Sequence, residues 1–468
     1  MKDNRDSIDF GKEPVGKIFR KMFLPTLVAM VTMVVLNITD GAFVGHGVGS
    51  DALAAVSIIA PVFLFIAGIG LMFGIGGSVV ASIHLSKGKV KAARINITQS
   101  LIGGFIVGCI LGGLIVAFQR ETCLLFGSSE KLIPLAKSYL VWIASFMPLC
   151  IVSNVGMFMV RLDGSPRIAM YLNITGAVLN MLGDGLLIYG LDIDFGFYHL
   201  IVPTFGLAGA AIATSFSYAL TGLCTIGYLL FFSKTLQLYR LRMTMKSLKL
   251  TLRNLGYQIR IGESAMLGEI AISALIIVGN YQFIRYMGED GVAAFSVACY
   301  MTPIAFMFGN AIVQSSQPII SFAHGRRNEK SFDHAQRIRQ AMRIDIATAV
   351  LCGIGGTLVM IFGADILSSI FLPSGCKAWE LCLEGLPLFG VSFAFVVLNL
   401  TMIGYYQSTE QASAATVFTL LRGFIILIPS FILMPLWFGT SGLWLSLGFS
   451  EMATFMIICA NYLMKKRM

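Results

Sequence analysis

The chain has 468 residues, of which 56% are hydrophobic and only 12% are charged, and its mean hydropathy is +0.81. A soluble protein carries about a quarter charged residues, so this composition excludes an ordinary cytosolic enzyme and an intrinsically disordered chain. The net charge of +10 would suggest a nucleic-acid partner in a soluble protein. In a chain this apolar we expect a lipid bilayer and no nucleic acid, and the distribution of the charge matters more than its size.

Twelve apolar runs follow one another along the chain, each bounded by charged residues. A helix needs about 20 apolar residues to cross a bilayer. The runs are continuously apolar, which argues against the alternating pattern of an outer-membrane barrel. We therefore predict an all-α membrane protein with twelve transmembrane helices, at residues 22–45, 52–83, 95–118, 133–159, 168–190, 205–232, 258–286, 292–322, 344–370, 381–405, 412–437 and 440–463.

Lysine and arginine are distributed unevenly between the two sides of the predicted membrane. With the amino terminus in the cytoplasm, 28 of them fall on the cytoplasmic side and five on the other side. This asymmetry follows the positive-inside rule. It predicts a multi-pass protein of the cytoplasmic (inner) membrane with both termini in the cytoplasm. The first 21 residues are polar and lack the apolar core of a cleavable signal peptide.

Two short motifs of the first half recur in the second half. The sequence GSDALAAVSI at 49–58 returns as GEDGVAAFSV at 288–297, and FGLAG at 205–209 returns as FGTSG at 438–442. Each half holds six predicted helices, so the two repeats share one orientation, as in transporters built from parallel repeats. We predict two pseudo-symmetric six-helix bundles, residues 1–232 and 257–468, joined by a basic cytoplasmic linker at 233–256. That linker is either a contact with lipid headgroups or a solvated connection.

Ionisable and amide side chains lie inside the apolar runs of the first half, where they are costly and therefore candidates for function. Asp40 and Asp184 lie toward the outer ends of the first and fifth predicted helices. Asn180 and Asn173 precede Asp184 by four and eleven residues, so the three share one helical face. We expect these groups to converge with Tyr139 and Asn154 inside the amino-terminal bundle. Two carboxylates surrounded by amides can hold one monovalent cation or share protons.

The second half has a different set of candidates. Glu263 and Glu269 lie in or near the seventh helix on different faces, and Arg422 lies inside the eleventh. Arg422 either pairs with a carboxylate or anchors the bundle, and both interpretations stay open. Glu269 and Arg422 are the candidate site residues of this half. Pro25 lies within the first helix, where the missing backbone hydrogen bond permits a kink.

The sequence lacks the residues that several other activities require. The sequence contains no GxxxxGK[ST] motif for nucleotide phosphates. Its five histidines show no spacing typical of metal ligands, so we expect no metal site apart from a possible Na⁺ at the aspartates, and no cofactor. No constellation of a nucleophile and a base is evident, so we do not expect an enzyme.

Seven groups of residues together resemble the MATE family (multidrug and toxic compound extrusion). The similarity covers all twelve predicted helices, and the order and spacing of the motifs are specific. They are Pro25 with Asp40, DALAA at 51–55, GGS at 76–78, LSKG at 85–88, DGSP at 163–166, Asn180 with Asp184, and FGLAGAAIAT at 205–214.

This resemblance implies a monomeric secondary active antiporter that exports organic, often cationic compounds in exchange for inward Na⁺ or H⁺ by alternating access. It assigns the coupling-ion site to Asp40, Asn180, Asp184 and Thr214, with Tyr139 and Asn154 lining the same cavity, and bending of the first helix to Pro25. The second half departs from the family pattern, because Glu269 lies about one turn from the family's glutamate and the tenth helix has no mid-helix acid. Residues 191–204 look like an insertion.

Rival interpretations belong to other classes. A flippase for lipid-linked sugars of the same superfamily usually has fourteen helices and a strongly cationic cavity, whereas this chain has twelve predicted helices and only Arg422 deep within one. A receptor or channel fits the internal repeat less well. We predict the antiporter and keep the flippase as the alternative.

Overall fold

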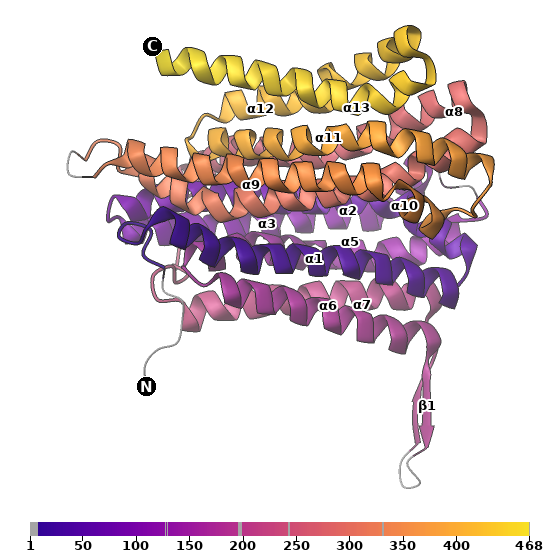
Figure 1. The fold of residues 1–468 in the computed structure, drawn as a ribbon. Coiled ribbons are helices and arrows are strands. Elements are labelled where there is room, and N and C mark those ends of the chain that lie inside the picture. Colours follow the sequence, from indigo (N-terminus) through magenta and orange to yellow (C-terminus); the bar gives the residue numbers. More distant parts are fainter. Residues whose placement is uncertain are drawn as a thin grey trace. The chain divides into compact units, whose positions relative to one another are not determined.

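The computed structural model describes residues 8–126, 128, 130–194, 199–241, 244–329 and 332–467, and nearly all of them are helical (Figure 1). The first half contains α1 (Val15–Gly47), α2 (Ser50–Ser86), α3 (Val90–Ala117), α4 (Gln119–Leu125), α5 (Ile133–Leu162), α6 (Pro166–Tyr189) and α7 (Gly206–Gly227), which continues as the π-helix η1 (Tyr228–Phe232). The second half contains α8 (Met245–Gly325), α9 (His334–Phe362), α10 (Ala364–Phe371), α11 (Lys377–Ser408), α12 (Ala412–Leu420), the π-helix η2 (Leu421–Ile425) and α13 (Leu427–Arg467).

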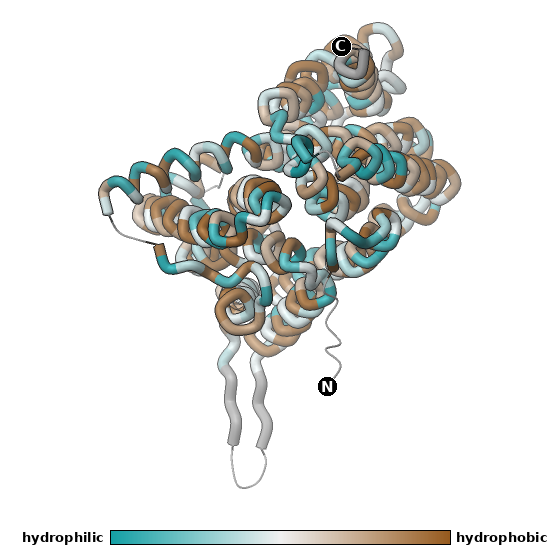
Figure 2. The backbone as a smooth tube through the Cα atoms, turned by 90° about the vertical axis from the view of Figure 1, so that its left-hand side faces the viewer, coloured by the Kyte–Doolittle hydropathy of each residue, from teal (hydrophilic) through white to brown (hydrophobic). Residues whose placement is uncertain are grey.

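The predicted number of transmembrane helices is confirmed. Among the described residues, ten helical segments are long and apolar enough to cross a membrane. Two of the ten contain a sharp bend, α8 at Gly288 (φ 68°, ψ −158°) and the α12–α13 segment at Gly439 (φ 58°, ψ −140°). Dividing each at its glycine gives twelve spans. In Figure 2 hydrophobic positions run along the helices, and hydrophilic positions gather mainly on the connections.

One departure from an all-helical chain is a hairpin between α6 and α7. Strands β1 (Leu191–Asp194) and β2 (His199–Val202) pair antiparallel, with Leu191 opposite Val202 and Asp194 opposite His199. The hairpin falls within residues 191–204, which the sequence marks as an insertion. The surrounding helices keep the order expected without it.

The chain divides into two compact units. One comprises residues 1–12 and 24–262, and the other comprises residues 13–23 and 263–468. The described part of the connection at 233–256 therefore belongs with the first unit, whose boundary lies at Gly262. The first turns of α1 belong with the second unit, so α1 passes from one unit to the other between Phe23 and Leu24.

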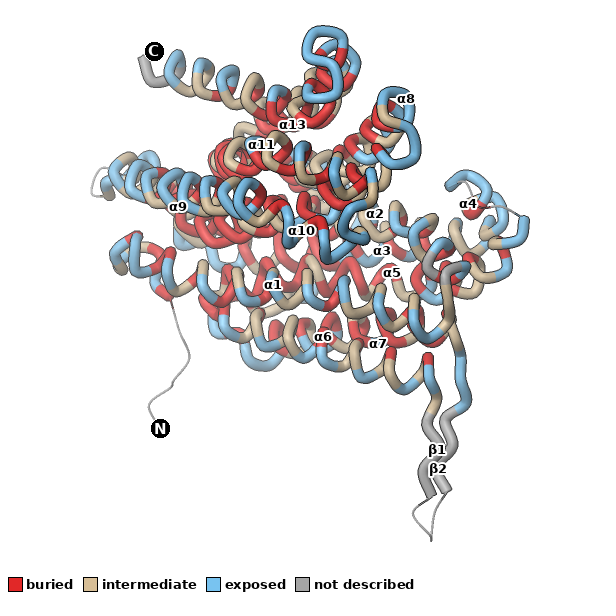
Figure 3. Tube along the Cα trace, turned by 45° about the vertical axis from the view of Figure 1, so that its right-hand side comes forward, coloured by how far each residue is buried: buried red, intermediate tan, exposed pale blue. Residues whose placement is uncertain are grey.

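Within each unit some helices are central and others peripheral. In the first unit 72% of the residues in the apolar stretch of α5 are buried, compared with 28% in the apolar stretches of α1 and α6. In the second unit 56% of the residues in the apolar stretch of α11 are buried, compared with 22% in that of α9. Figure 3 shows the resulting contrast between buried and exposed turns along these helices. The exposed apolar faces of the peripheral helices suit contact with lipid.

The internal repeat is visible in the backbone. Gly49 and Gly288, the first residues of the recurring ten-residue motif, both have positive φ, and so do Gly206 and Gly439 of the second motif. These glycines lie before corresponding helices and have a positive φ, which glycine adopts readily because it has no Cβ atom. The two halves therefore share local geometry where their sequences agree.

A third pair of corresponding turns has similar backbone geometry, although the two sequences differ there. After α5, Gly164 has a φ of 85°, and after α11, Glu410 has a φ of 59°. The same backbone hydrogen bonds close both turns. Thus Ser165 N donates to Val160 O at 3.2 Å, and Gln411 N donates to Tyr406 O at 2.9 Å. Glu410 has the only positive φ of a non-glycine residue in the described part of the chain.

Candidate functional site

Two carboxyl groups face one another within the first unit. Asp40 lies on α1 and Asp184 on α6, and the two side chains are within hydrogen-bonding reach of each other. Asp184 is 0% exposed. One oxygen of Asp40 and both oxygens of Asp184 are buried without a hydrogen-bond donor among the described residues. Two buried carboxylates this close repel each other unless a proton or a cation lies between them.

An amide and a hydroxyl group lie beside this pair. Asn180, one turn before Asp184 on α6, donates from Nδ2 to the Thr214 Oγ1 atom of α7 at 3.1 Å. Asn180 is 2% exposed and Thr214 is 8% exposed. The bond holds α6 against α7 next to Asp184. These oxygen-bearing groups are of the type that Na⁺ and protons require.

Two tyrosines complete the surroundings of the carboxyl pair. Tyr139 of α5 is 1% exposed and lies close to both Asp40 and Asp184. Tyr218 of α7 lies close to Asp40. Tyr218 was not among the sequence candidates, although it follows Thr214 by four residues and so shares its helical face. That spacing was the available signal.

The other two asparagines make bonds to their own helices. Asn154 donates from Nδ2 to the carbonyl oxygen of Cys150 at 3.1 Å, and its side chain packs closely on Gly70 of α2. Asn173 donates to the carbonyl oxygen of Ala169 at 3.0 Å. Both are half-buried. Within the described residues neither makes a hydrogen bond to the aspartate pair.

Pro25 lies inside α1, which continues without interruption from Val15 to Gly47. The hydroxyl group of the next residue, Thr26, is buried without a hydrogen-bond partner among the described residues. Pro25 comes two residues after the point at which α1 passes from the second unit to the first. Pro25 has no backbone N–H, so one carbonyl group of α1 lacks its helical hydrogen bond. This interruption therefore lies where α1 passes from the second unit to the first.

The second unit contains a buried ion pair. Arg422 of η2 donates to Glu451 of α13, from Nη2 to Oε1 at 2.7 Å and from Nε to both carboxylate oxygens at 3.0 and 3.2 Å. The side chains are 4% and 2% exposed. Asn399 of α11 donates to the Glu451 carboxylate at 2.7 Å, and the Arg422 guanidinium lies 5.0 Å from the centre of the Phe306 ring. Of the two interpretations of Arg422, the structure shows the pairing with a carboxylate.

Three buried charged residues escaped the sequence interpretation. Glu451 lies within the apolar run 440–463, and Asp345 lies near the start of the run 344–370 with 1% exposure. Arg161 is one of the 28 Lys and Arg residues counted on the cytoplasmic side, but it is 3% exposed and lies 5.7 Å from the centre of the Phe158 ring. A charged residue inside an apolar run was the available signal for Glu451 and Asp345.

The remaining acidic candidates lie apart from one another in the second unit. Glu263 accepts a hydrogen bond from Thr416 Oγ1 at 2.9 Å. Glu269 is half-buried and makes no hydrogen bond or ion pair within the described residues. Among all the residues that the structure describes, no group of three or more His, Cys, Asp and Glu side chains is placed to hold a metal ion.

Known proteins resemble the chain along nearly its whole length. The MatE family model matches residues 25–186 and 265–433. The multidrug export protein MepA of Staphylococcus aureus (strain MRSA252) is 22% identical over 465 residues, which cover 98% of this chain and 96% of that protein. An FAD transporter of Shewanella oneidensis is 25% identical over 436 residues, which cover 93% of this chain and 91% of that protein.

Solved structures share the fold. An outward-facing multidrug resistance MATE family transporter of the MOP superfamily superimposes with a TM-score of 0.85 at 20% identity, covering 98% of this chain and 97% of the other. A MOP superfamily transporter from Pyrococcus furiosus gives a TM-score of 0.85 at 19% identity over the same shares. The family match extends over more than half of the residues and includes both Asp40 and Asp184. The chain therefore belongs to the MatE family of membrane transporters.

Proposed function

We propose that this transporter is a secondary active antiporter, which exports organic, often cationic compounds in exchange for inward Na⁺ or H⁺. The observation that carries the proposal is the facing pair Asp40 and Asp184, whose buried oxygens have no donor among the described residues. Such a pair suits the reversible binding of one proton or one Na⁺. Asn180 and Thr214 supply further oxygen ligands at its side.

Binding of the ion would change how α1 and α6 pack. With the ion bound, the mutual repulsion of Asp40 and Asp184 disappears and the two helices can approach. The far end of α1 belongs with the second unit, so a change in α1 is transmitted through Pro25 to that unit. Alternating access then follows from movement of the two units, with drug release coupled to ion entry.

The membrane potential drives such a cycle whenever net charge moves inward. A potential of 100 mV contributes about 2.3 kcal/mol for each charge that moves inward. For an uncharged compound exchanged for one ion this corresponds to roughly a fortyfold concentration ratio, whereas a monovalent cation exchanged for one ion moves no net charge and depends on the concentration gradient of the ion. The proposal places the protein in the cytoplasmic membrane as a monomer, with both termini in the cytoplasm.

Efflux from energised everted vesicles tests the proposal, with Na⁺ and pH gradients imposed separately. We expect one of the two gradients to drive ethidium transport, and the Asp40→Asn and Asp184→Asn variants to transport less than about a tenth as fast at equal expression. Asp51→Asn is the matched control, because Asp51 is 55% exposed and pairs with Lys131. Wild-type transport by both buried-site variants, or transport that needs neither gradient, would refute the proposal.

The substrate class requires its own comparison. The Shewanella relative is named for FAD, which is anionic, whereas MepA is named for multidrug export. The vesicle assay therefore includes FAD and a fluorescent lipid-linked sugar beside ethidium. Movement of the lipid-linked sugar alone would favour the flippase over the antiporter, and movement of FAD alone would assign a flavin substrate.

A further inference from the structure

A basic stretch leads into α8. Residues 195–262 contain seven Lys and Arg residues and no Asp or Glu, and Glu263 follows at the next position. Three side chains of this stretch, Arg253, Tyr257 and Arg260, follow one another at intervals of four and three residues along α8. This spacing places them on one face of the helix.

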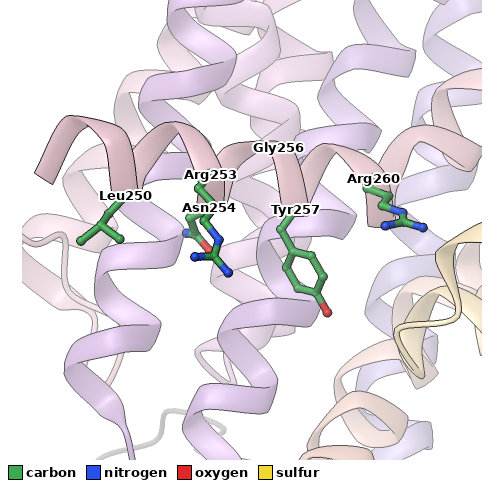
Figure 4. A pocket seen from close by; sticks show the side chains of 6 residues that line it. All are labelled: Leu250, Arg253, Asn254, Gly256, Tyr257 and Arg260. Carbon is green, nitrogen blue, oxygen red and sulfur yellow. The ribbon is translucent and has the colours of Figure 1, made fainter. Parts of the chain in front are cut away.

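These three residues line a cavity in the first unit. The cavity has a volume of about 570 Å³, and Leu250, Asn254 and Gly256 complete its lining. Figure 4 shows Arg253 and Tyr257 extending from the same side of the helix, with the Arg260 guanidinium beyond the tyrosine ring. Tyr257 is 42% exposed, and Arg253 makes no hydrogen bond or ion pair with the described residues. The cavity is thus open, positively charged and large enough for a small organic anion.

Contacts with α3 hold this part of α8 in place. Asn254 donates from Nδ2 to Asn96 Oδ1 at 2.7 Å and also to Gln99 Oε1. Gln258, which is 0% exposed, donates to the same Asn96 oxygen at 3.1 Å. Gly262 brings the backbone of α8 against the carbonyl group of Met72 on α2. The backbone that carries the two arginines is therefore preorganised, which reduces the entropy lost on ligand binding.

We infer that this cavity binds phosphate groups of an anionic ligand. A guanidinium group presents a planar fork of donors that matches phosphate oxygens, and Tyr257 adds a hydroxyl group and a ring between the two arginines. The phosphate can belong to a lipid headgroup, because Leu248 and Leu252 on the same helix are 50% and 62% exposed and a basic amphipathic helix lies at the bilayer interface. It can also belong to a soluble phosphorylated compound.

Purified full-length protein distinguishes the two sources. For lipid, the protein is reconstituted in nanodiscs with equal amounts of phosphatidylglycerol and phosphatidylcholine, and the lipids that remain bound are counted by native mass spectrometry. For soluble compounds, inorganic pyrophosphate is titrated in neutral detergent and binding is followed by calorimetry. The test variant is Arg253→Gln/Arg260→Gln. The matched control is Lys246→Gln/Lys249→Gln, which removes the same charge from exposed positions of α8 outside the cavity.

We expect the test variant to lose about tenfold in affinity for each guanidinium–phosphate contact, while the control changes less than about threefold. Loss confined to phosphatidylglycerol assigns the site to lipid, and loss of pyrophosphate binding assigns it to soluble phosphates. Equal losses in test and control variants would overturn the inference, because they would reflect net charge alone. Binding of neither probe by the wild-type protein would also overturn it.

Discussion

The buried ion pair of the second unit allows a quantitative prediction. Glu451→Gln keeps the size of the side chain and removes its charge, so that Arg422, which is 4% exposed, remains charged without an ionised partner. Removing one partner of a buried ion pair costs about 3–5 kcal/mol. For a unit of this size each 1 kcal/mol corresponds to about 2–4 °C. We therefore expect the midpoint of thermal unfolding to fall by about 10 °C.

The reasoning makes a second, opposite prediction for the double variant. When Arg422→Met is combined with Glu451→Leu, no buried charge is left, and burial of apolar side chains in place of an ion pair is neutral or stabilising. The double variant is expected to unfold at or above the temperature of the Glu451→Gln variant. An exposed pair provides the control, since Glu329→Gln breaks the Arg326–Glu329 contact at a cost below about 1 kcal/mol.

The assay is unfolding of the purified protein in one detergent at one scan rate, because unfolding of a membrane protein need not be reversible. Fluorescence of a thiol-reactive dye reports the exposure of buried cysteines such as Cys382. A Glu451→Gln midpoint no lower than that of Glu329→Gln would refute the reasoning. So would a double variant that unfolds well below the single variant, because an uncompensated buried charge would then not be the cause.

Three further predictions concern the backbone. Gly262→Ala places a methyl group against the carbonyl group of Met72 and should lower the free energy of unfolding by about 1–3 kcal/mol. Gly268→Ala on the same helix meets no atom within 4 Å and should raise the free energy of unfolding by about 0.5–1 kcal/mol. Thermal unfolding of the two variants tests these opposite shifts. Glu410→Gly should be about 1 kcal/mol more stable than Glu410→Ala, because glycine accepts a φ of 59° without strain, and equal midpoints would contradict the strain. Pro25→Ala should slow ethidium efflux severalfold without lowering the unfolding midpoint, since it restores a backbone donor and stiffens α1; unchanged efflux would remove Pro25 from the transport cycle.

The residues beside the aspartate pair show how far the sequence interpretation reached. Asp40 and Asp184 were selected because each is a carboxylate inside an apolar run, and the four-residue spacing placed Asn180 on the face of Asp184. Tyr218 was missed because a tyrosine in an apolar run carries no penalty that marks it. Its four-residue spacing from Thr214 places it on the same helical face, but its position near Asp40 depends on how α7 packs, which hydropathy does not report.

The sequence by itself determined the membrane class, the twelve spans and the two related halves. These properties follow from the transfer free energies of single residues and from local glycine conformations, which act within one helix or turn. The sequence also predicted that Asp40 and Asp184 converge. Only the tertiary structure decided that Arg422 meets Glu451 and that Arg253 and Arg260 line one cavity. Such meetings depend on which helices are neighbours and on the rotation of each about its axis, and packing over the whole unit sets both.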